Sequence, residues 1–209
     1  MNLKNRISIS YTCFILSIIF LSCKNNIGIE DYKVYLYNPD NGLIQTKNVN
    51  NIRFEITYQP CEFISYMEIK NNRKSSVDDL NKVIRKYEDF FYMRLNILSK
   101  FGEAYETLIG EQQKYSQLIN DLCFNMEDYV YLITSDNDSI GIVDYISPRT
   151  YGMAPNTTVL FSFRKIDFEN IEWIKLVIND FGLRSGNISF KFYADDIIDA
   201  PDIVLNIKQ

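Results

Sequence analysis

The chain has 209 residues, of which 46% are hydrophobic and 14% aromatic, and it carries a formal net charge of −5. This length suits one domain, or two small ones, with an apolar core large enough to fold without a metal or a disulfide. The negative charge disfavours nucleic acid as a partner, and the absence of histidine excludes Ser-His-Asp, Cys-His and histidine–metal sites.

The first 22 residues have the layout of a bacterial lipoprotein signal peptide. Lys4 and Arg6 precede an apolar run of about 15 residues, which is shorter than the ~20 residues that a membrane-spanning helix needs. Phe20–Ser22 stand directly before Cys23, close to the lipobox arrangement of apolar residues, a small residue and the acylated cysteine. The N-terminus therefore predicts export, cleavage before Cys23 and attachment of lipid to that cysteine.

This processing would leave 187 residues with a net charge of −7, because Lys4 and Arg6 are removed with the signal peptide. A diacylglycerol and an amide-linked acyl chain on Cys23 would bind the membrane almost permanently. We expect residues 23–31 to be a lipidated tether and residues 32–209 to be a globular domain of the bacterial cell envelope, on the outer membrane and facing the periplasm or the outside. The alternative is an ordinary secretion signal in which Cys23 is incidental.

The first part of the domain is predicted to contain strands and turns. Tyr32–Tyr37 and Leu43–Val49 are predicted strands, and Asn38–Gly42 between them has the composition of a turn. Ile52–Tyr58 gives the clearest strand pattern, because its apolar and polar residues alternate with a period of two. Pro60 limits this strand.

A helix is predicted to begin after Ser76, which can cap its first turn. Its apolar residues recur at helical spacing and fall on one face; they are Val77, Leu80, Ile84 and Tyr87. The period returns to two in a strand around Met93. A second, weaker helix is predicted over Glu103–Asn120, interrupted by Gly110, because glycine costs ~1 kcal/mol in a helix interior.

The second half of the chain is predicted to be a series of strands, because apolar residues alternate with more polar ones. The alternating residues are Leu122, Phe124 and Met126; Val130 and Leu132; Ile140 and Ile142; Val159, Phe161 and Phe163; Ile174, Leu176 and Ile178; Ile188, Phe190 and Phe192; and Ile203, Leu205 and Ile207. Turn residues at 135–138 and 182–187 are spaced for hairpins. We expect an α+β fold that is mainly antiparallel β, arranged as a β-sandwich, with one or two short inserted helices.

Two stretches of the sequence resemble a group of bacterial proteins. The first is Asn38–Leu43 followed by a strand that ends in Thr57–Pro60, and the second is Tyr151–Phe163. Together with the lipobox and the short helix between them, they resemble small, functionally uncharacterised lipoproteins of Bacteroidota. The resemblance implies a location in the envelope and a domain type, and it implies no catalytic residue.

Two cysteines of the predicted mature domain are not acylated. Cys61 and Cys123 could form a disulfide, which would close a loop of about 60 residues and stabilise the fold by ~4 kcal/mol in an oxidising compartment. The alternative is two separate, small buried residues. Without histidine they are too few for a zinc site, and the glycines are too widely spaced for a dinucleotide-binding loop. We expect no metal and no cofactor.

Two acidic clusters are the remaining source of catalytic or metal-binding groups. Asp136–Asp138 begins like a calcium-binding loop, but Ile140 and Ser147 stand where oxygen ligands belong, so a hairpin turn fits better. The second cluster contains Asp195, Asp196, Asp199 and Asp202. Paired carboxylates can hydrolyse glycosides, but we favour a solvated loop edge that discourages aggregation between strands.

Most aromatic residues occupy inward positions of the predicted strands. Five fall on the opposite register and could form an exposed face for sugars or a protein partner; they are Tyr35, Tyr37, Tyr129, Tyr131 and Trp173. If a second layer packs over them, they are core residues instead.

The sequence therefore favours a non-catalytic, lipid-anchored module that binds or assembles with other envelope proteins. One alternative is an envelope glycan hydrolase that uses paired carboxylates. Another is a lipoprotein that captures a glycan or a peptide on a concave aromatic surface.

Overall fold

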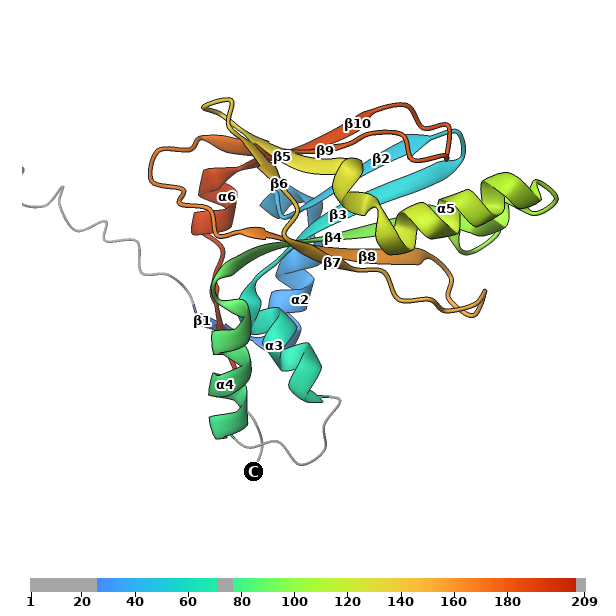
Figure 1. Cartoon of the computed structure of the whole chain (residues 1–209). Coiled ribbons are helices and arrows are strands. Elements are labelled where there is room, and N and C mark those ends of the chain that lie inside the picture. The colour runs from blue at the N-terminus through green and yellow to red at the C-terminus, as the bar shows by residue number, and fades with distance from the viewer. Residues whose placement is uncertain (1–25, 71–76, 206–209) are drawn as a thin grey trace, which may run out of the picture.

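Two antiparallel β-sheets form the body of the protein in a computed structural model that describes residues 26–70 and 77–205. The larger sheet has the strand order β2-β3-β4-β8-β7, and the smaller has the order β10-β9-β5-β6 (Figure 1). The larger sheet contains β2 (Ile44–Val49), β3 (Ile52–Gln59), β4 (Phe90–Ser99), β7 (Asp144–Ile146) and β8 (Thr157–Arg164). The smaller contains β5 (Val130–Thr134), β6 (Ser139–Gly141), β9 (Trp173–Ile178) and β10 (Ile188–Tyr193).

The described residues form five α-helices, where the sequence predicts one or two. They are α2 (Ile29–Tyr37), α3 (Cys61–Lys70), α4 (Val77–Tyr87), α5 (Gln112–Phe124) and α6 (Ala194–Ile198). Short 3-10 helices are η1 (Pro39–Asn41), η2 (Ala104–Leu108) and η3 (Met126–Asp128). None of the helices in these residues is long and apolar enough to cross a membrane. The predicted fold class, an α+β fold that is mainly antiparallel β, is confirmed.

The two sheets share one hydrophobic core. Phe54 of β3 lies opposite Ile97 of β4, and Met93 of β4 lies opposite Phe161 of β8. All four side chains are fully buried and belong to the same cluster as Leu176 of the smaller sheet. The alternation in the sequence therefore corresponds to the inward faces of the strands, where burial of apolar area stabilises the fold.

Most of the predicted elements are confirmed. The strands predicted at 43–49, at 52–58 and around Met93 are β2, β3 and β4, and the later strands from Val130 onward are β5, β6 and β8 to β10. Of the last predicted strand, Ile203 lies in β11, Leu205 follows its end, and Ile207 lies outside the described residues. The predicted turn at 38–42 contains η1 and ends at Gly42, which has a left-handed φ of 72°. The helix predicted after Ser76 is α4, although Ser76 itself lies outside the described residues. The second predicted helix divides around Gly110 into η2 and α5.

Two predicted strands are in fact helices, and one feature of the pattern explains both errors. Tyr32–Tyr37 lies within α2, and the stretch from Leu122 to Met126 spans the end of α5 and the start of η3. Apolar residues at i and i+4 fit either a strand or a helix face, so the residue between them is decisive. Val34 is 74% exposed and Phe124 is 67% exposed, because each points away from the face that its helix buries.

The folded domain begins earlier than the sequence predicts. Residues 26–31, which the sequence places in the tether, form β1 (Asn26–Gly28) and the start of α2. β1 pairs in parallel with β11 (Asp202–Val204), so that the first described segment lies beside the last one. Asn26, the first described residue, stands three positions after Cys23 and already belongs to β1.

Candidate ligand-binding site

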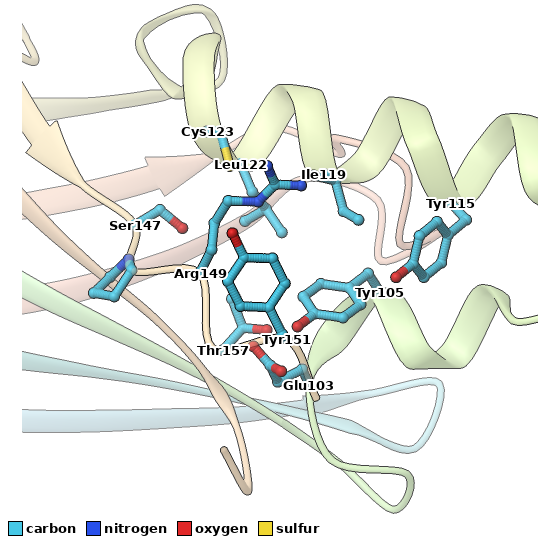
Figure 2. A pocket seen from close by; sticks show the side chains of 11 residues that line it. Glu103, Tyr105, Tyr115, Ile119, Leu122, Cys123, Ser147, Arg149, Tyr151 and Thr157 are labelled. Atoms are coloured by element: carbon cyan, nitrogen blue, oxygen red, sulfur yellow. The ribbon is translucent and has the colours of Figure 1, made fainter. Parts of the chain in front are cut away.

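A hollow lies between α5, η2 and the loop formed by residues 147–156 (Figure 2). The space in it that water can enter is about 60 Å³, well below the several hundred Å³ of a site that encloses a whole small molecule, so a ligand could insert only one end into it. It is lined by Glu103, Tyr105, Tyr115, Ile119, Leu122, Cys123, Ser147, Pro148, Arg149, Tyr151 and Thr157. We call it the tyrosine–arginine pocket, after its three tyrosines and its arginine.

One face of α5 forms the apolar wall of this pocket. Tyr115, Ile119, Leu122 and Cys123 follow each other at spacings of four, three and one residues, which places their side chains along one side of a helix. Leu122 is buried, and the other three are half-buried. The α5 side of the pocket therefore offers apolar contact and, through Tyr115, an aromatic ring.

Glu103 forms the floor and joins the two other walls. Its side chain is 2% exposed and accepts hydrogen bonds from the hydroxyl of Thr150 and the backbone N–H of Gly152 in the loop. The same carboxylate caps η2 by accepting from the N–H of Glu106, whose side chain in turn accepts from the N–H of Glu103. These bonds attach the loop to η2, and a second link runs from the N–H of Ala104 to the hydroxyl of Thr157 at 2.8 Å.

Tyr105 brings a hydroxyl group to the same corner. Its oxygen accepts from the N–H of Gly152 at 3.2 Å, and its ring meets the ring of Tyr115 edge-on, with centroids 5.6 Å apart. Burial and a hydrogen bond to Glu103 raise the pKa of Tyr105 to about 12. The phenol therefore stays protonated at neutral pH.

Arg149 and Tyr151 stand at the mouth of the pocket. The guanidinium of Arg149 lies 5.7 Å from the centre of the Tyr151 ring, and Figure 2 shows it reaching from the loop toward α5. Arg149 forms no ion pair with another described residue, and Tyr151 is 76% exposed. The mouth thus combines a guanidinium that has no ion-pair partner among the described residues with an accessible aromatic ring.

These groups favour binding over acid–base chemistry. The hydrogen bonds that Glu103 accepts already occupy its oxygens, and a buried carboxylate in this situation is a structural anchor for the chain. The residues that the structure describes contain no group of three Cys, Asp or Glu side chains that could hold a metal ion. What the pocket offers a ligand is a guanidinium, tyrosine hydroxyls and apolar walls, which suit a small molecule with an anionic end.

The aromatic residues singled out in the sequence come from several places in the fold. Tyr131 and Trp173 do lie on the outward face of the smaller sheet, where the ammonium groups of Lys175 and Lys191 lie 5.1 Å and 4.8 Å from the Trp173 ring. Tyr129, at the end of η3, packs against Phe181.

The other two belong to α2. Tyr35 packs against Tyr32, and Tyr37 accepts a hydrogen bond from Arg94. The strand register of the sequence therefore predicts the outward position of Tyr131 and Trp173 correctly. It is wrong for Tyr35 and Tyr37, because their segment is a helix.

The disulfide that the sequence leaves as one of two possibilities for Cys61 and Cys123 is not formed in the structure. Cys61 begins α3 and Cys123 lies near the end of α5, and both are free and half-buried. Burial and the neighbouring Glu62 raise the pKa of the Cys61 thiol to about 12. The alternative of two separate small residues therefore describes the structure.

The acidic clusters have different surroundings. Asp136–Asp138 forms the turn between β5 and β6, with Asn137 at a φ of 66°, as the hairpin reading predicts. Asp196 lies against Gly42, where a Cβ would collide with its carboxylate, and burial raises its pKa. Asp202 lines a hollow that also contains Glu62. The use of these carboxylates in glycoside hydrolysis stays a prediction.

Sequence reasoning missed the tyrosine–arginine pocket because its parts are far apart in the chain. Glu103 and Thr150 are 47 positions apart, and no periodic pattern links them. One local signal was available: the irregular stretch from Ser147 to Asn156 combines an arginine and an exposed tyrosine with two prolines and a glycine. Loops of this composition commonly carry binding residues.

Comparison with known proteins does not identify the chain. No protein-family model matches the sequence, and no curated protein matches it. Among solved structures, a protein of unknown function from Burkholderia pseudomallei K96243 is similar, with a TM-score of 0.41 and 10% sequence identity over 83% of this chain and 93% of that chain. A likeness at this level supports no conclusion about function.

Glu103→Gln should loosen the loop of the pocket. The amide replaces one acceptor oxygen by a donor and leaves the Thr150 hydroxyl or the Gly152 N–H unpaired, which costs about 1–3 kcal/mol of unfolding free energy. Denaturant unfolding measures this loss, and hydrogen exchange at Gly152 should accelerate with it. Glu169→Gln, at an exposed position, is the matched control and should change neither quantity; equal effects of the two variants would contradict the assigned role of Glu103.

Cys61 should be unreactive in the folded protein. Because the thiolate is the reactive form and the thiol pKa is about 12, alkylation by iodoacetamide at about pH 8 should be slower than in the denatured protein by on the order of a thousandfold. The rate should rise as the pH approaches that pKa. Mass spectrometry of the unreduced protein should find both Cys61 and Cys123 free, and detection of a disulfide between them would show this account of the cysteines to be wrong.

Proposed function

We propose that this protein is a lipid-anchored protein of the bacterial cell envelope that binds a small carboxylate-bearing ligand in the tyrosine–arginine pocket and does not transform it. The observation that carries the proposal is the mouth of the pocket, where the Arg149 guanidinium has no ion-pair partner among the described residues and stands beside the exposed ring of Tyr151. The lipobox before Cys23 supports the anchor, and so does the resemblance to lipoproteins of Bacteroidota.

Arg149 supports the choice of an anionic ligand. Arginine binds a carboxylate through two parallel hydrogen bonds, and such charge-assisted bonds are about twice as strong as neutral ones. The domain is acidic, with a precursor net charge of −5, so an exposed arginine in a concave site attracts anions that the rest of the surface repels. The tyrosine rings and the α5 wall would contact the apolar part of the same ligand.

Two sources could supply such a ligand in the envelope. A glycan can carry the carboxylate on a hexuronic acid, and a peptide can carry it at its C-terminus. Both present a carboxylate next to a body with hydroxyl or apolar groups, which matches the composition of the pocket. They differ in how they would use Tyr151, because sugar rings stack face-on against aromatic rings.

Arg149→Gln should weaken the binding of carboxylate ligands by about 10- to 100-fold, because a hydrogen bond to a charged group contributes about 1.5–3 kcal/mol. Calorimetric titration with a hexuronate disaccharide, an acetylated dipeptide with a free C-terminus and the amide of each would measure the loss. Arg164→Gln is the matched control, because Arg164 is exposed at the end of β8 and lies outside the pocket. Equal affinity for acids and amides, or equal losses in the two variants, would rule out this role for Arg149.

Cys23→Ala should abolish lipidation and release the protein from membranes. The thioether-linked lipid needs the Cys23 thiol, and no helix of the described residues is long and apolar enough to hold the protein in a membrane in its place. Metabolic labelling with an alkyne fatty acid and membrane fractionation measure both effects, and Cys13→Ala within the signal peptide is the control that should keep label and membrane. Unchanged labelling or unchanged membrane retention in Cys23→Ala would mean that the anchor is assigned wrongly.

A further inference from the structure

The start of the folded domain limits where a lipid on Cys23 can lie. Asn26 is already paired with Asp202 in the β1–β11 sheet. An extended chain advances at most ~3.6 Å per residue, so Cys23 and Asn26 can be at most about 11 Å apart. A membrane that takes up this lipid must therefore lie next to the β1–β11 sheet.

α4 stands at the same end of the molecule. Glu62 of α3 lines one hollow with Ile203 of β11, and it lines a second hollow with Ile84 of α4 and with Glu88, the residue that follows α4. Glu62 thus lies between α4 and the strand that pairs with β1. In Figure 1, α4 and β1 are drawn at the same end of the molecule, away from α5.

The solvent-facing side of α4 is basic. Leu80 packs inward and is 5% exposed, whereas Lys82, Arg85 and Lys86 are exposed. Their spacing of three and four residues places them on one side of the helix. Lys86 is paired with Glu68 at 3.3 Å, but Lys82 and Arg85 form no ion pair with any described residue. We call these three residues the basic face of α4.

Helix electrostatics explain only part of this arrangement. Basic residues in the last turn complement the helix dipole, which accounts for Arg85 and Lys86. Lys82 lies one turn earlier, where it gains little from the dipole. Asp78 and Asp79 of the first turn stand four and three residues before Lys82, and this spacing offsets its repulsion by Arg85 and Lys86. The exposed acidic residues Glu88 and Asp89 follow α4 at the end that leads into β4 and do not interrupt the basic face.

We infer that the basic face of α4 lies against anionic phospholipid headgroups of the membrane in which Cys23 is anchored. This inference rests on the proposed lipid anchor and adds an orientation to it. The occupant of the face follows from two independent features: the short reach from Cys23 to Asn26 and the positive charge that Lys82, Arg85 and Lys86 place in the second half of α4 on an acidic protein. With α4 on the membrane, the tyrosine–arginine pocket faces away from it, toward ligands in solution.

Photo-crosslinking on the lipidated protein tests the orientation. The full chain is expressed with benzoylphenylalanine at Asn81, beside the basic face, or at Gln113 on α5 as the distal control; both positions are exposed. The purified lipoprotein is reconstituted into vesicles of phosphatidylethanolamine and phosphatidylglycerol, and phospholipid adducts are counted by mass spectrometry. We expect at least about fivefold more adducts at Asn81 than at Gln113, since each basic residue near an anionic surface favours contact by roughly that factor.

The excess of adducts at Asn81 should depend on the charges of both the basic face and the lipids. Lys82→Glu with Arg85→Glu should remove the excess at Asn81, and so should vesicles of phosphatidylcholine alone. Lys47→Glu with Lys100→Glu changes the net charge equally at exposed sites elsewhere and should leave the excess intact. Protein that floats with the vesicles but crosslinks equally at both positions would overturn the orientation and keep the anchor, whereas protein that does not float with any vesicle would overturn both.

Discussion

The carboxylate of Glu103 is the interaction on which the candidate site depends. It is buried beneath the pocket and accepts hydrogen bonds from Thr150 and Gly152, while it also caps the first turn of η2. Burying an unpaired carboxylate would cost several kcal/mol, so the site is stable only while these donors are in place. Because the loop at 147–156 contains no strand or helix of its own, this junction and the bond between Ala104 and Thr157 give the loop its position. The shape of the pocket mouth therefore depends on these hydrogen bonds.

The sheets provide the rigid support for this junction. Thr157 is the first residue of β8, and β8 pairs with the central strand β4 along its whole length. Phe161 and Met93 face each other in the shared core, so the start of β8 cannot shift without disturbing packed side chains. On the other side, Leu118 and Leu122 fix α5 to the same core. The pocket therefore lies between two elements that the core holds in place and one loop that Glu103 holds.

The sequence allows the strands to be predicted wherever one face is buried, because alternation is then the dominant signal. It fails at Val34 and Phe124, where an exposed apolar residue between two buried ones imitates a strand in a helix. The pocket could not be predicted for a different reason: Glu103 acts on residues 47 and 49 positions away, and a single sequence contains no trace of such a contact. The outward positions of Tyr131 and Trp173 were predictable, since they follow directly from strand register. The lipobox is a local motif, and the lipid on Cys23 stays a prediction that concerns residues outside the described part of the chain.

The protein has two ends with different features. The β1–β11 sheet and α4 lie at one end, and α5 with the tyrosine–arginine pocket lies at the other (Figure 1). The central claim is that Arg149 and Tyr151 select a carboxylate. Crystallographic soaking tests this claim most directly, with pairs of small fragments that differ only in carrying a carboxylate or the corresponding amide. The account predicts that the acids are found in the pocket with the carboxylate on the Arg149 guanidinium and that the amides are absent. Acids and amides bound alike, or acids bound elsewhere on the protein, would contradict it.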